Sequence, residues 1–131
     1  MNNKEEDIKE LVSYWLEKSQ ESLEAARDEM KAGRISFSVN RIYYACFYAV
    51  SAVLLKKELR FKKHSGVRAA FHQHLIKSGM VDDQYRKFYD ELFEARQRGD
   101  YIELVSFEKN QVEDWLQQAS QFVEAIKSLV K

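Results

Sequence analysis

The run IYYACFYAVSAVLL, residues 42–55, contains no charged residue, no glycine and no proline. It is apolar or aromatic on almost every side of a helical wheel, and a helix of this kind is normally buried on all sides. A membrane span needs roughly 18 or more apolar residues, which is longer than this run. We therefore expect residues 34–59 to form the central helix of an all-α bundle.

Four further segments have the three- and four-residue spacing of apolar residues that is typical of amphipathic helices. They span about residues 5–31, 66–77, 84–99 and 106–130. Gly33 is placed to end the first helix, Ser65 to cap the third, and Asp82 or Asp83 to cap the fourth. The prediction is an antiparallel up-and-down bundle of four main helices plus a short fifth helix, around the central helix 34–59, in a single domain of 131 residues.

The charges of the chain balance, with 21 basic and 21 acidic side chains. This excludes a globally basic nucleic-acid binder but leaves room for a local basic patch. Such a patch is found at residues 56–68, where six Lys or Arg face a single acid, Glu58. The lone Cys46 has no partner for an intrachain disulfide and is expected to be a small buried hydrophobe. The N-terminus is polar and unlike a signal peptide, so we expect a cytoplasmic protein.

Arg96 is the first candidate for a functional residue, because it lies where the apolar stripe of its helix reaches the helix end. Asp100 is four residues further on, close enough to pair with Arg96 if the last turn stays helical, and Tyr101 follows directly. A guanidinium in such a setting suits a phosphate group. The alternative is a structural Arg–Asp pair that only anchors the helix end, and spacing alone favours it.

Lys63, His64 and Ser65 form a second candidate site, at the start of the expected third helix. Exposed backbone N–H groups at a helix start, with cations beside them, bind anions well. A solvated basic loop is the alternative. Arg41 interrupts the apolar pattern at the entrance to the central helix. It either contacts a phosphate or simply extends its head to water or to an acid of a neighbouring helix.

The sequence predicts no metal site and no cofactor. His72 and His74 are two residues apart, so they face different sides of a helix. There is no Glu-x-x-His pair, no Cys/His cluster and no glycine-rich phosphate loop.

Three segments taken together resemble the HEPN domain family, whose members are small all-α proteins common in bacteria and archaea. Residues 40–49 are similar to the family signature R-x-Y-Y-A-x-F-x-A, and residues 63–67 to its K-x-H-S-G-V or T-H-S-G element. Residues 96–101 are similar to its R-x-x-A/G-D-Y ending. The order and spacing of all three fit, and with the flanking helices the resemblance covers nearly the whole chain.

The resemblance implies a bundle of four main helices with an additional short one, a homodimer, and a role linked to nucleotides or RNA. HEPN proteins often act beside a minimal nucleotidyltransferase in two-gene modules of toxin–antitoxin type. Several relatives are metal-independent RNA endonucleases, in which an Arg is followed four to six residues later by a His.

The chain departs from that nuclease pattern, because Tyr101, Ile102 and Glu103 occupy the positions where the His is expected. Without an imidazole there, the site lacks a proton-transfer group suited to neutral pH. We therefore interpret the chain as a non-catalytic module that binds a nucleotide, RNA or a partner protein, with Arg96 on the phosphate, Asp100 orienting it and Tyr101 stacking. Two alternatives are an RNA endonuclease toxin that uses Arg96 and Tyr101, and a purely structural dimerisation or adaptor domain.

Overall fold

The computed structural model describes residues 3–99 and 106–130, and all regular structure in those ranges is helical. The elements are α1 (Asn3–Lys31), α2 (Ile35–Lys56), α3 (His64–Ala70), the π-helical segment η1 (Phe71–Ile76), α4 (Gln84–Gly99) and α5 (Lys109–Ser128). Because η1 continues α3 without a break, the described residues form five helical rods. The all-α, five-helix prediction is confirmed.

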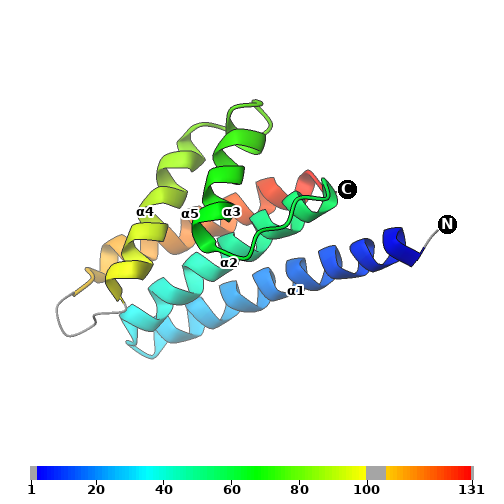
Figure 1. Ribbon diagram of the computed structural model, residues 1–131. Helices are drawn as coiled ribbons and strands as arrows, with labels where there is room; N and C mark the ends of the chain where they lie inside the picture. Colours follow the sequence, from blue (N-terminus) through cyan, green and yellow to red (C-terminus); the bar gives the residue numbers. More distant parts are fainter. Residues whose placement is uncertain (1–2, 100–105, 131) are drawn as a thin grey trace.

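The helices pack around α2, as predicted (Figure 1). α1 and α2 are an antiparallel pair joined by a short turn, and α5 contacts both of them while running in the direction of α2. α3 with η1, and then α4, form a hairpin that crosses α2 on another side. The four long helices therefore alternate in direction along the chain.

α2 is buried because its side chains are apolar all round. Ile42, Ala45, Cys46 and Ala49 are all fully inaccessible to solvent. By length and hydropathy alone the whole helix α2, which is longer than the run 42–55, could cross a membrane. However, 67% of the most apolar 18-residue stretch of α2 is buried inside the protein, as expected for a core helix.

Two buried serines hold α1 against α2. The Ser19 hydroxyl donates to the Ala45 carbonyl at 2.6 Å, and the Ser38 hydroxyl donates to the Ala26 carbonyl at 2.9 Å. A buried hydroxyl without a partner would be destabilising, and these two find theirs on the facing helix. Their small side chains also allow the two backbones to approach closely.

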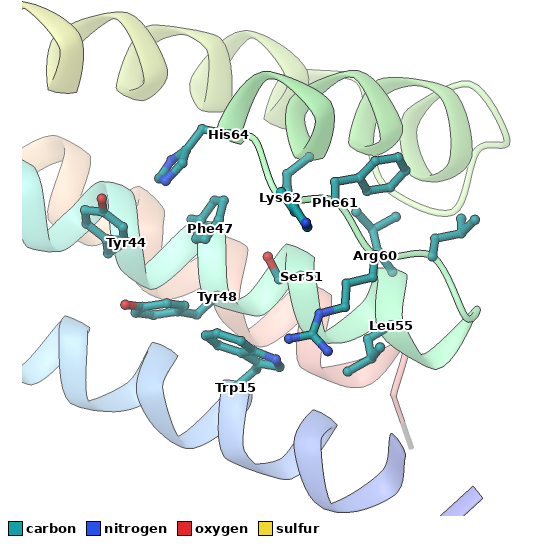
Figure 2. A pocket seen from close by; sticks show the side chains of 13 residues that line it. Trp15, Tyr44, Phe47, Tyr48, Ser51, Leu55, Arg60, Phe61, Lys62 and His64 are labelled. Carbon is teal, nitrogen blue, oxygen red and sulfur yellow. The ribbon is translucent and has the colours of Figure 1, made fainter. Parts of the chain in front are cut away.

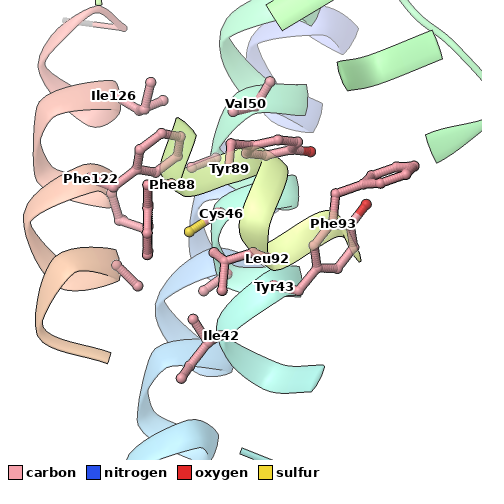
Figure 3. Packing of buried hydrophobic residues seen from close by; sticks show 14 of the residues in the cluster. Ile42, Tyr43, Cys46, Val50, Phe88, Tyr89, Leu92, Phe93, Phe122 and Ile126 are labelled. Carbon is pink, nitrogen blue, oxygen red and sulfur yellow. The ribbon is translucent and has the colours of Figure 1, made fainter. Parts of the chain in front are cut away.

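Aromatic rings fill the space between α2, η1, α4 and α5 (Figure 3). The Phe71 ring lies 4.9 Å from the Tyr89 ring and 5.7 Å from the Phe122 ring, between ring centroids. Between the two arms of the α3–α4 hairpin, Asp90 is 2.9 Å from the His72 ring nitrogen and 3.8 Å from the Arg68 guanidinium. The ring contacts pack the hairpin against the bundle, and the polar contacts hold its two arms together.

Helix ends differ from the predictions where backbone geometry controls them. Gly33 ends α1 in a left-handed conformation, as predicted. α2 stops at Lys56 and not at residue 59, because Glu58 takes a positive φ of 61° and the N–H of Leu59 closes the end on the Leu54 carbonyl.

At helix starts, the predicted cap Asp82 is confirmed, since its carboxylate accepts from the Gln84 N–H at 2.9 Å. The prediction that Ser65 caps the third helix was wrong. α3 already begins at His64, so its cap position falls on Lys63, whose side chain makes no capping hydrogen bond. α5 begins at Lys109, three residues after the predicted start at residue 106.

Replacing Cys46 by Asp should unfold the protein or cost most of its stability, because it places an unpaired charge at a fully buried position of α2. We expect a loss of roughly 3–5 kcal/mol or more in the free energy of unfolding, measured by urea denaturation. Cys46→Ala, which keeps the site small and apolar, is the matched control and should cost far less. A stable Cys46→Asp protein would contradict the central position of α2.

Candidate functional site

Arg96, in the last turns of α4, lies over two aromatic rings of α2. The central guanidinium carbon of Arg96 is 5.0 Å from the ring centroid of Tyr43 and 6.0 Å from that of Tyr44. Its Nε is buried and has no hydrogen-bond partner among the residues that the structure describes. The cation is therefore held by aromatic faces. The predicted partners Asp100 and Tyr101 lie outside the described residues, so their roles stay predictions.

His64, the first residue of α3, packs on the same part of α2. Its ring stacks on Phe47 with 4.3 Å between centroids and an interplanar angle of 11°. It also lies 5.7 Å from the rings of both Tyr43 and Tyr44. His64 Nδ1 and the Tyr43 hydroxyl are hydrogen-bonded at 2.7 Å, so the orientation of the imidazole is fixed.

The two candidate sites of the sequence therefore meet in space, with Tyr43 and Tyr44 between them. We call Arg96, His64, Tyr43 and Tyr44 together the Arg96–His64 site. Burial lowers the pKa of His64, and the positive charge of Arg96 lowers it further, so the imidazole is neutral at neutral pH. Burial raises the pKa of Tyr43 to about 12, so its hydroxyl keeps its proton.

The other predicted phosphate contacts lie on the surface around this site. Lys63 and Ser65 flank His64 and are exposed to solvent. Arg41 is also exposed, and on α2 it precedes Tyr44 by three residues, so the two share a helix face. Whether these three residues contact a phosphate stays a prediction.

A pocket opens beside the site, along one face of α2 (Figure 2). Between Ile42 and Leu55, the only residues of α2 that are not buried are Tyr44, Phe47, Tyr48 and Ser51. Their spacing of three, four and seven residues places them on a single helix face. All four line a cavity of about 440 Å³, together with residues of α1, of α3 and of the segment between α2 and α3. We call this cavity the α2 pocket.

Sequence reasoning missed the α2 pocket. Tyr48 belongs to the run 42–55 that is expected to be buried on all sides, yet it is half-buried and lines the cavity together with the half-buried Trp15 of α1. The signal that could have revealed it is the basic run 56–68, because Arg60, Lys62 and His64 from that run stand at its rim. Among the described residues, no group of three or more His, Cys, Asp or Glu side chains is placed to hold a metal ion.

Replacing Arg96 by Gln should raise the pKa of His64, because it removes the nearby positive charge and leaves the burial largely unchanged. NMR titration of the imidazole would measure the midpoint in wild type and variant. Arg98→Gln is the matched control, since Arg98 is exposed on the same helix and should leave the midpoint where it is. An unchanged midpoint in Arg96→Gln would show that the two side chains are not electrostatically coupled.

Comparison with known proteins agrees with the resemblance seen in the sequence. The profile of the HEPN domain matches residues 12–129. A "UPF0332 protein" of Thermotoga maritima is 47% identical over 131 residues, which cover all of this chain and 96% of the relative.

Two proteins of Methanocaldococcus jannaschii, each named "putative toxin", are also similar. One is 36% identical over 86% of this chain and 76% of its own length, and the other is 30% identical over 95% of this chain and 92% of its own length. Since the HEPN profile and these relatives each cover most of the sequence, the chain belongs to the HEPN domain family.

Proposed function

We propose that the chain is a non-catalytic HEPN module that binds a phosphate group of RNA or of a nucleotide at the Arg96–His64 site. One observation carries the proposal: the described residues hold the Arg96 guanidinium by aromatic faces and give it no carboxylate, while its Nε lacks a hydrogen-bond partner. A cation held by ring faces keeps its positive charge, which can attract an anion. A structural ion pair would need a carboxylate, and among the described residues none pairs with this guanidinium.

The names of the relatives support a role in a toxin system, since two of them are named as toxins. We propose that this chain acts in a toxin–antitoxin module and recognises RNA or a nucleotide there. The homodimer and the minimal nucleotidyltransferase partner that the HEPN resemblance implies stay predictions, and so does the cytoplasmic location expected from the polar N-terminus.

Single-stranded RNA should bind to the wild type and bind at least about tenfold more weakly to Arg96→Ala, across different sequences. The slope of log affinity against log salt should fall by roughly 0.7 when one phosphate contact is lost. Fluorescence anisotropy at several salt concentrations measures both quantities. Arg98→Ala removes an exposed cation of the same helix and is the matched control.

One result would contradict the phosphate-binding role of Arg96. If Arg96→Ala lowers the free energy of unfolding but leaves RNA and nucleotide affinity at the wild-type value, Arg96 is structural. The dimerisation or adaptor domain would then be the better description.

A second candidate function, a metal-independent RNA endonuclease, is favoured by the position of His64. The imidazole that is missing after Arg96 in the sequence is supplied in space by α3, and it is neutral at neutral pH. A neutral imidazole could take the proton of a ribose 2′-hydroxyl as its oxygen attacks phosphorus, then return it to the departing 5′ oxygen. The products would be a 2′,3′-cyclic phosphate and a 5′-hydroxyl.

Incubation with single-stranded RNA and tRNA in the presence of a metal chelator separates the two functions. The non-catalytic proposal predicts intact RNA with the wild type. Cleavage by the wild type, lost in both His64→Ala and Arg96→Ala but kept in Arg98→Ala, would replace it with the endonuclease.

A further inference from the structure

The α2 pocket is continuous with the Arg96–His64 site, because His64 and Tyr44 belong to both. From Tyr44 it follows α2 as far as Leu55. At 1.5 Å per residue this is a length on the order of 16 Å. A ligand held at Arg96 by one phosphate could therefore extend directly into the pocket.

One wall of the pocket is aromatic and comes from two helices. The rings of Trp15 on α1 and Tyr48 on α2 are stacked, with 5.2 Å between centroids and an interplanar angle of 24° (Figure 2). Phe47 and the 39%-exposed Phe61 add further ring surface. Flat, partly exposed aromatic surface of this kind is what nucleobases stack on.

The rim of the pocket is cationic. Arg60 and Lys62, both exposed, stand at its opening next to His64, and no Asp or Glu is among the described residues that line it. The chain as a whole is neutral, so this is a local concentration of positive charge. Aromatic walls below a basic rim fit a ligand that has both a flat base and phosphates.

We propose that the α2 pocket binds an unpaired base of single-stranded RNA on Trp15 and Tyr48, with Arg60 and Lys62 on the adjoining backbone phosphate. This inference rests on the proposed function, because the same strand passes the Arg96–His64 site. It adds a selectivity: a base paired in a duplex is not free to enter, so single strands bind in preference to duplexes.

Trp15 provides a direct test, since the chain has only two tryptophans and the other, Trp115, is buried. In a Trp115→Phe background, a short single-stranded RNA should quench Trp15 fluorescence, and the same strand annealed to its complement should not. The double variant Arg60→Gln/Lys62→Gln should weaken single-strand binding by roughly tenfold or more. Lys77→Gln/Lys87→Gln removes the same charge from exposed positions of the α3–α4 hairpin and should change binding little.

The possible results separate this inference from the proposed function. Suppose that RNA binding is lost in Arg96→Ala, but that RNA does not quench Trp15 fluorescence and Arg60→Gln/Lys62→Gln has no effect on binding. This result would overturn the proposed role of the α2 pocket and support the Arg96–His64 site. Quenching that depends on Arg60 and Lys62 but not on Arg96 would keep the pocket and overturn the site. If duplex RNA quenches Trp15 fluorescence as strongly as the single strand does, the pocket does not select an unpaired base. The same conclusion follows if Trp15 fluorescence falls without RNA because the protein associates with itself.

Discussion

α2 leaves very little of its surface to solvent, and every other helix has to be placed around it. From Ile42 to Leu55 only one helix face stays partly open, and that face carries Tyr44, Phe47, Tyr48 and Ser51. α1 and α5 cover the apolar faces, while α3 and α4 cross the helix beside the open one. The neighbouring helices leave one part of α2 uncovered, and this determines where the Arg96–His64 site and the α2 pocket lie.

Aromatic rings also determine how the polar groups are held. Arg96 lies over the rings of Tyr43 and Tyr44. The His64 ring stacks on Phe47 of α2 and is hydrogen-bonded to the Tyr43 hydroxyl. Within the described residues the guanidinium is positioned by ring faces, which do not neutralise its charge. The proposed anion site depends on this charge.

The sequence predicts the fold class well, because periodicity within each helix is a local property that residues 42–55 and their neighbours display directly. It predicts helix ends less well: α2 ends early because Glu58 adopts a left-handed backbone, a conformation that side-chain type does not announce. That His64 and Arg96 approach the same two rings, Tyr43 and Tyr44, could not be predicted, since it depends on how α3 and α4 cross α2. The partial exposure of Trp15 and Tyr48 could not be predicted, because periodicity cannot separate a fully covered aromatic side chain from a half-covered one.

The central claim is that Arg96 and His64 act as one site although they come from different helices. A double-mutant cycle with Arg96→Gln and His64→Asn, measured as affinity for single-stranded RNA, tests it most directly. We expect the double variant to lose less affinity than the sum of the single losses, with a coupling energy above about 0.5 kcal/mol. Strictly additive losses would show that the two side chains bind independently and would contradict the account.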